Sequence, residues 1–143
     1  MIKKAAGYVR VSSKGQVDNE SLTTQRRSIK DYAKSKGWEL LDIYADEGIS
    51  GGSTKQRPAL LRLLCDAKDG KFNVLIIRDL SRFGRNATEL LNNCEDLERA
   101  GIQLWSIKEG IDFSGKLGKF FRQILASIAE LEREMIRERV MEN

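Results

Sequence analysis

The 143-residue sequence contains no histidine. This absence excludes Ser-His-Asp triads, Cys-His pairs and histidine metal sites. The only cysteines, Cys65 and Cys94, lie in helical patterns and form no C-x-x-C pair, so we expect buried thiols rather than a disulfide. The sequence also lacks G-x-G-x-x-G and G-x-x-x-x-G-K-[ST], so any phosphate chemistry must use something other than a glycine-rich nucleotide loop.

Long apolar runs are missing as well. No stretch approaches the length of a membrane span, and the N-terminus has no signal-peptide apolar region, so we expect a cytoplasmic protein with no membrane partner. With 41% hydrophobic residues, 32% charged residues and a single proline, the composition is that of one ordinary globular domain. The net charge of +4 is compatible with a nucleic-acid partner but does not establish one.

Apolar strands alternate with amphipathic helices through the first three quarters of the chain. Strands are expected at 5–11, 38–44, 73–80 and 102–107. Helices are expected at 22–36, 58–69 and 87–100, with the segment "KEGIDFSG" as a loop. In the second helix, the expected core face is Leu60, Leu61, Leu63, Leu64 and Ala67. This alternation predicts an α/β fold: a mostly parallel sheet of about four to five strands with helices on both faces.

One long helix without an internal breaker is expected from Lys116 to about Arg139. Its apolar residues are spread too widely for a single core-facing stripe. The helix either packs on two sides of its own domain or, as we favour, packs partly on a second subunit. We therefore expect a core over residues 1–115, and over 116–143 the start of an oligomerisation helix leading to a further C-terminal DNA-binding region.

Arginines, hydroxyls and carboxylates lie at or just beyond the ends of three of the expected strands. They are Arg10, Ser12 and Ser13, then Asp46, Glu47, Ser50 and Arg57, and finally Arg82 and Arg85. Because the carboxyl ends of parallel strands share one edge of a sheet, these groups are expected to meet there. The planar fork of arginine matches phosphate oxygens, and a serine beside such a cluster is a candidate nucleophile. The structural alternative is that Arg82 or Arg85 simply pairs with Asp79 or Glu89.

The motifs "YVRVSS", "SLTTQ", "DEGISGGSTKQRPAL", "DLSRFGRN" and "AELEREMIRERV" occur in this order along nearly the whole chain. In this arrangement the sequence resembles the catalytic domain of the serine recombinases, the family of resolvases, invertases and large serine integrases and transposases. The motifs "DLSRFGRN" and "GISGGSTKQRPAL" lean toward the large type carried by mobile elements.

The resemblance implies a role for each matching residue. Ser12 would be the nucleophile, with Ser13 the less favoured neighbour, and Arg10, Arg57, Arg82 and Arg85 would be the catalytic arginines. Supporting positions would be Tyr8, Gln25, Asp46, Ser50, Ser81 and Arg139. Many members carry an aspartate where this chain has Ser81. Asp79, two residues earlier, is expected to share a strand face with Ser81 and could replace that carboxylate.

By this resemblance the protein is a site-specific DNA recombinase of bacterial, phage or mobile-element origin. Ser12 would attack a DNA phosphate to give a 5′-phosphoserine intermediate, without metal, ATP or other cofactor. The partners would be double-stranded DNA and further copies of the chain, as a homodimer assembling into a synaptic tetramer. Two rivals remain open: a magnesium-dependent nuclease or phosphotransferase using Asp42, Asp46, Glu47 and Asp79, and a non-catalytic DNA-binding oligomerisation module.

Overall fold

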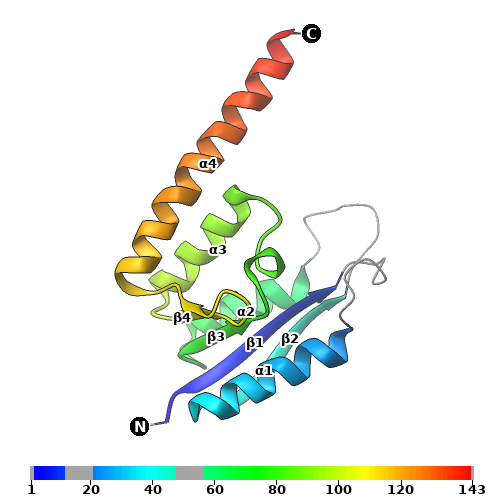
Figure 1. The fold of residues 1–143 in the computed structure, drawn as a ribbon, viewed down its shortest axis with the longest axis vertical. Helices are drawn as coiled ribbons and strands as arrows, with labels where there is room; N and C mark the ends of the chain where they lie inside the picture. The colour runs from blue at the N-terminus through cyan, green and yellow to red at the C-terminus, as the bar shows by residue number, and fades with distance from the viewer. Residues whose placement is uncertain (1, 12–20, 48–56, 143) are drawn as a thin grey trace.

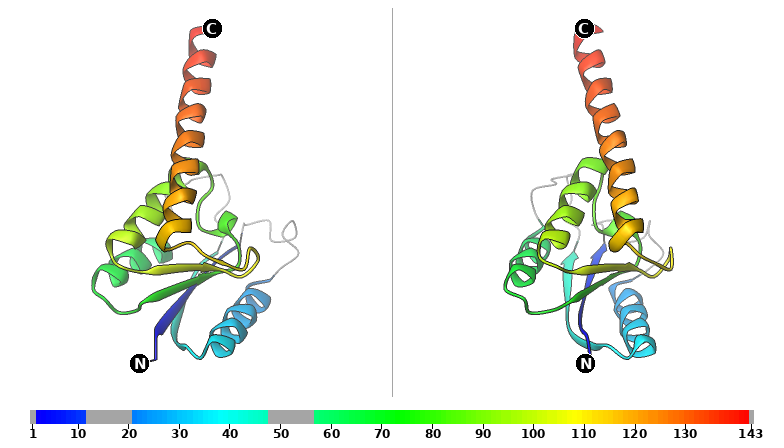
Figure 2. Two further views of the ribbon diagram at one scale, coloured as in Figure 1. Left: turned by 60° about the vertical axis from the view of Figure 1, so that its left-hand side comes forward. Right: turned by 90° about the vertical axis from the view of Figure 1, so that its left-hand side faces the viewer.

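The computed structural model describes residues 2–11, 21–47 and 57–142 (Figure 1). Three of the sequence-predicted residues, Ser12, Ser13 and Ser50, lie outside these ranges. The described part forms a sheet with helices on both faces and a long C-terminal helix that extends beyond the body (Figure 2). The predicted fold class is thereby confirmed.

The sheet has five strands in the order β2-β1-β3-β4-β5. The strands are β1 (Lys4–Val11), β2 (Glu39–Glu47), β3 (Val74–Ile77), β4 (Gln103–Ser106) and β5 (Ile111–Asp112). The pairs β1–β2, β1–β3 and β3–β4 are parallel, and β4–β5 is antiparallel. Because β2 lies on one side of β1 and the later strands lie on the other, the switch in strand order falls between β1 and β3. In sheets of this kind the carboxyl edge at the switch is where ligands bind.

Helices cover the two faces of the sheet unequally (Figures 1 and 2). On one face α1 (Leu22–Lys36) buries Ile29 and Ala33 against β1 and β3. On the other face lie α2 (Pro58–Lys68) and α3 (Ala87–Arg99), with the short 3-10 helix η2 (Leu80–Arg82) before α3. Burial of apolar side chains on both faces explains why β3 is a continuous apolar run with no exposed residue.

The helix boundaries follow local chemistry. Ser21 caps α1 by accepting a hydrogen bond from the Thr24 amide at 3.2 Å. Gly37 ends the helix with a φ of 73°, the left-handed conformation that favours glycine. Pro58 occupies the first turn of α2, where its missing N–H costs nothing. The predicted helix at 22–36 and the predicted start of the second helix at 58 are thereby confirmed.

Several finer predictions were wrong. Leu61 is 60% exposed on α2, because only the side of the helix carrying Leu60, Leu63 and Ala67 faces the sheet. Cys65 is exposed for the same reason, whereas Cys94 is buried, and both thiols are free. The third strand ends at Ile77 rather than continuing to Leu80, and part of the predicted loop 108–115 forms the short strand β5.

The C-terminal helix α4 (Gly115–Glu142) packs on α3 with one side only. Leu125 and Ala129 are buried there. Its other sides expose large apolar residues: Leu117, Phe120, Ile124, Ile128, Leu131, Met135, Ile136, Val140 and Met141. No helix in the described ranges has the length and apolar character needed to cross a membrane.

Candidate active site

The carboxyl end of β1 carries the half-buried side chain of Arg10. Its Nη2 donates a hydrogen bond to the main-chain carbonyl of Ser81 at 2.9 Å, and its own carbonyl accepts one from Nη1 of Arg82 at 3.1 Å. Arg10 therefore ties the end of β1 to η2. An arginine is tolerated in this strand because it is the last residue but one, at the polar edge of the sheet.

Tyr8 and Asp46 connect β1, β2 and α2. The Tyr8 hydroxyl donates to Asp46 Oδ2 at 2.7 Å, and the same carboxylate accepts from the amides of Ala59 at 2.9 Å and Leu60 at 3.1 Å. Arg57, the residue at the N-cap position, makes no side-chain cap, so Asp46 from β2 caps α2 instead. Burial, together with this hydrogen bond to Asp46, raises the pKa of Tyr8 well above its ordinary range.

Arg57 immediately precedes α2 and is only 6% exposed. Its Nη1 forms an ion pair with Glu89 in the first turn of α3. Its Nη2 is buried and has no hydrogen-bond partner within the described part of the chain. A buried guanidinium with an unused donor is costly unless an anion completes its hydrogen bonding.

The segment after β3 turns sharply into η2. Asp79 caps this turn, accepting hydrogen bonds from the Ser81 amide at 3.0 Å and from the Ser81 hydroxyl. The two residues do meet, but as cap and turn rather than on one strand face. Arg82 is buried, with its Nε 3.8 Å from Asp79 Oδ2. The proposed pairing of Arg82 with Asp79 is thus present alongside its contact with Arg10.

Two features fix η2 against α3. A Cβ on Gly84 would lie 2.6 Å from the Leu90 Cα, so only glycine permits this close approach. Asn93 donates from Nδ2 to the Phe83 carbonyl at 2.7 Å. These contacts hold the segment between Arg82 and Arg85 in place, with Arg82 buried and Arg85 exposed.

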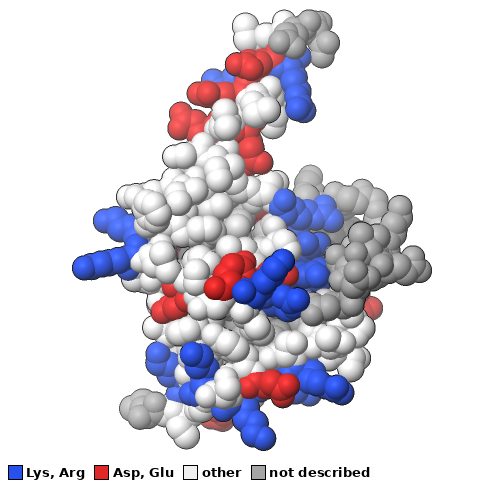
Figure 3. Space-filling model, in the orientation of Figure 1, with Lys and Arg blue, Asp and Glu red and all other residues white. Residues whose placement is uncertain are grey.

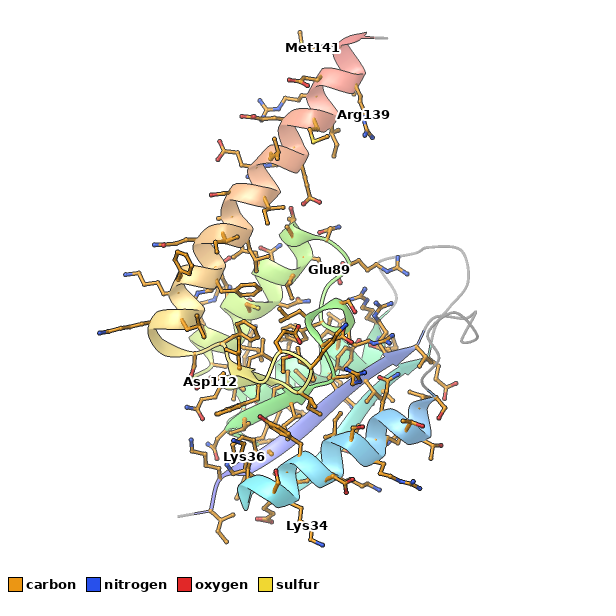
Figure 4. The ribbon with its side chains drawn as sticks, in the orientation of Figure 1. Lys34, Lys36, Glu89, Asp112, Arg139 and Met141 are labelled. Carbon is orange, nitrogen blue, oxygen red and sulfur yellow. The ribbon has the colours of Figure 1, made fainter. Side chains whose placement is uncertain are left out.

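The remaining predicted residues lie at different distances from this cluster. Gln25 is fully buried near the start of α1, and neither atom of its amide has a hydrogen-bond partner within the described ranges. Arg139 lies far out along α4, away from the carboxyl edge (Figure 4). The structure therefore gathers Tyr8, Arg10, Asp46, Arg57, Ser81, Arg82 and Arg85 but leaves Arg139 apart.

Positive charge dominates the edge. Burial lowers the pKa of Arg10, and the neighbouring guanidiniums of Arg57, Arg85 and Arg82 lower it further. One group of Lys and Arg side chains lies right of the centre of the body in Figure 3, toward the side where Figure 1 places the carboxyl ends of β1 and β2, and others lie at the left and at the bottom. Clustered guanidiniums of this kind can bind a phosphate and stabilise charge that develops on it. Among the described residues no three acidic or cysteine side chains are grouped to hold a metal ion.

Sequence reasoning missed three supporting residues. Glu89 was considered only as a partner of Arg82 or Arg85, whereas it pairs with Arg57. Asn93 is a polar residue on the buried face of a helix, a pattern that could have drawn attention to it. Glu109 accepts from the Leu80 amide at 3.3 Å and from the Ser106 hydroxyl at 2.6 Å, so it supports the start of η2.

Comparison with known proteins identifies relatives of this arrangement. The family model described as "Resolvase, N terminal domain" matches residues 5–143. The chain is 33% identical to the probable DNA-invertase y4cG of Sinorhizobium fredii, over 96% of the chain and 40% of that protein. It is 36% identical to the serine recombinase gin of Escherichia phage Mu, over 94% of the chain and 63% of that protein.

A solved structure agrees with these matches. The resolvase family site-specific recombinase from Streptococcus pneumoniae is similar with a TM-score of 0.84 and 34% identity, covering 99% of this chain and 95% of that one. The chain thus spans 40% and 63% of the two curated relatives, but nearly all of the solved one.

Proposed function

Because the chain belongs to the resolvase family, whose N-terminal domain it matches, we propose that it is the catalytic domain of a site-specific serine recombinase acting on double-stranded DNA. The observation that carries this proposal is the group of arginines at the carboxyl edge, where Arg57 is buried with an unused donor. Such a site calls for an anion. Ser12 follows β1 directly, so a hydroxyl nucleophile is one peptide bond away from the end of that strand.

In the proposed reaction Ser12 Oγ attacks the phosphorus of the scissile phosphodiester. A bond forms between Oγ and phosphorus while the bond to the 3′ oxygen breaks, which gives a 5′-phosphoserine link and a free 3′-hydroxyl. The serine loses its proton and the departing oxygen gains one. Rejoining reverses these steps with the 3′-hydroxyl of the exchanged strand. Since one phosphodiester replaces another, the exchange needs no ATP.

The arginines would stabilise the negative charge on the phosphate. Arg10, Arg57, Arg82 and Arg85 can donate to the phosphate oxygens and balance the additional charge of the transition state without a metal ion. Tyr8 stays protonated because its pKa is raised, and Asp46 already accepts three hydrogen bonds. These two residues therefore order the site rather than remove the serine proton.

The α4 surface supports the assembly part of the proposal. Its exposed apolar residues lie on the sides of the helix that α3 leaves uncovered, as a contact with a second copy would require. We propose a homodimer through α4 that pairs into a tetramer for strand exchange. Arg139, near the end of α4, would act at that stage, and DNA sequence would be read by a region outside this chain. Action on cellular DNA would place the protein in the bacterial cytoplasm.

Covalent trapping tests the proposal. The complete recombinase is incubated in EDTA with a nicked duplex that carries its own recombination junction, so that cleavage cannot reverse. We expect a protein–DNA adduct on a denaturing gel from the wild type and from Ser13→Ala, and none from Ser12→Ala.

The rivals predict different results. An activity that disappears in EDTA would support the magnesium-dependent nuclease. Absence of an adduct from wild-type protein on DNA that it demonstrably binds would support the non-catalytic module and overturn the proposal.

A further inference from the structure

Glu89 makes the one ion pair of Arg57 within the described residues. The two residues come from different elements, since Arg57 precedes α2 and Glu89 lies in the first turn of α3. Glu89 is partly exposed, whereas Asp46, the buried carboxylate of the site, is occupied by Tyr8 and by the first amides of α2. The position of the Arg57 guanidinium therefore depends on Glu89.

The contact uses only part of the guanidinium. Nη1 forms an ion pair with Glu89 but no regular hydrogen bond, and Nη2 is buried with neither kind of partner in the described ranges. Arg10 lies close enough that the charge of Arg57 is the strongest of the charges lowering its pKa. The Arg57 guanidinium is therefore part of the cluster of positive charge at this edge.

The surroundings of Glu89 suit a fixed carboxylate. Its amide donates to Asn86 Oδ1 at 2.8 Å, which caps α3, and a negative charge is favourable in the first turn of a helix. Figure 4 shows Glu89 at the end of α3 that lies nearer the carboxyl edge of the sheet. Since α3 is packed in the core through Leu90 and Leu97, this carboxylate stands on a rigid support.

We propose that Glu89 is a positioning residue for strand cleavage. It holds Arg57 through Nη1, so that the guanidinium is already oriented within the arginine cluster before the DNA arrives, with the Nη2 donor left for a phosphate oxygen. This inference rests on the proposed recombinase function and adds a residue that acts through Arg57. In this inference the orientation of the Arg57 guanidinium matters as well as its charge, and Glu89 on α3 sets that orientation.

The test compares Glu89→Gln with a matched control, Glu95→Gln, in the complete recombinase. Glu95 lies on the same helix and loses the same charge, but the structure gives it no ion pair with Arg57. DNA affinity, thermal midpoint and the single-turnover rate of adduct formation on the nicked duplex are measured. We expect Glu89→Gln to slow adduct formation by about tenfold or more, with DNA affinity within about twofold of wild type, because misplacement affects the reacting geometry most.

Two further variants separate positioning from folding. Glu89→Asp keeps the charge at shorter reach and should give an intermediate rate. In an Arg57→Lys background, which lacks the forked guanidinium, Glu89→Gln should change the rate by less than about twofold, because the residue acts through Arg57.

Each outcome has a defined meaning. A wild-type rate in Glu89→Gln, or an equal loss in the wild-type and Arg57→Lys backgrounds, would overturn this inference while leaving the recombinase proposal intact. The absence of an adduct from both wild type and Glu95→Gln would overturn the proposed function, and this inference with it.

Discussion

The middle of the sheet and its carboxyl edge differ in how well their buried groups are satisfied. Val74, Leu75, Ile76 and Ile77 in β3 are fully buried among apolar neighbours. At the carboxyl edge of the sheet, Arg57 is buried almost as completely, but it has a hydrogen-bond donor that lacks a partner in the described part of the chain. The middle of the sheet is built for stability, whereas the edge carries unmet interactions that a ligand can complete. Substitutions in the middle of the sheet should therefore lower the free energy of unfolding, whereas removal of a charge at the edge should raise it.

The largest effect is expected in the middle of the sheet. Ile76→Ala should lower the free energy of unfolding by about 3 kcal/mol, because it removes a fully buried side chain and leaves a cavity. Urea denaturation measures the change. Leu61→Ala on α2 is the control, since its 60% exposure predicts a loss under about 0.5 kcal/mol. Similar losses in both variants would contradict the assignment of the core.

An intermediate effect is expected where the two regions meet. Asp46→Asn should cost about 2 kcal/mol, because the carboxylate accepts from Tyr8 and caps α2, and an amide group would set a donor against one of these donors. The same denaturation assay applies. Glu47→Gln, the exposed neighbour in β2, removes an equal charge and should change little. A stable Asp46→Asn protein would show that the cap is dispensable.

The smallest effect on the free energy of unfolding, and the only increase among these substitutions, is expected at the carboxyl edge. The pKa of Arg10 is lowered by burial and by three guanidiniums, so its charged form is less favourable in the folded than in the unfolded chain. Arg10→Gln should therefore raise the free energy of unfolding by about 0.5 kcal/mol in low salt, even as we expect adduct formation to be lost.

Added salt should reduce this gain, because it screens the repulsion that the substitution relieves. Arg27→Gln on α1, away from the cluster of guanidiniums, should have no such gain. A clear destabilisation by Arg10→Gln would mean that its hydrogen bond to Ser81 outweighs the repulsion.

The sequence predicted the elements better than their ends and contacts. The range 22–36 was correct for α1, because the spacing of Leu22, Ile29 and Ala33 and the cap at Ser21 are local signals that can be seen in the sequence. The end of β3 was wrong because an apolar run does not show where Asp79 turns the chain into η2. β5 was missed because two residues, Ile111 and Asp112, carry no recognisable period.

Within the site, the sequence predicted residue types but not their pairing. The convergence of Arg10 and Arg82 follows from parallel strands, and the structure confirms that they meet. The cap that Asp46 provides to α2 and the pairing of Arg57 with Glu89 join elements far apart in the chain. No local pattern encodes such contacts, because they depend on how whole helices dock on the sheet.

The base of α4 has a mechanical consequence. A helix of 28 residues is about 42 Å long, so a tilt of about 10° at its base would move its far end by about 7 Å. That base is set by Gly118, where an added Cβ would fall 1.9 Å from the Phe113 carbonyl oxygen. One glycine thus permits the close contact that sets the direction in which α4 leaves the sheet, so a small change of packing at this point would be amplified into a larger displacement at the far end of the helix.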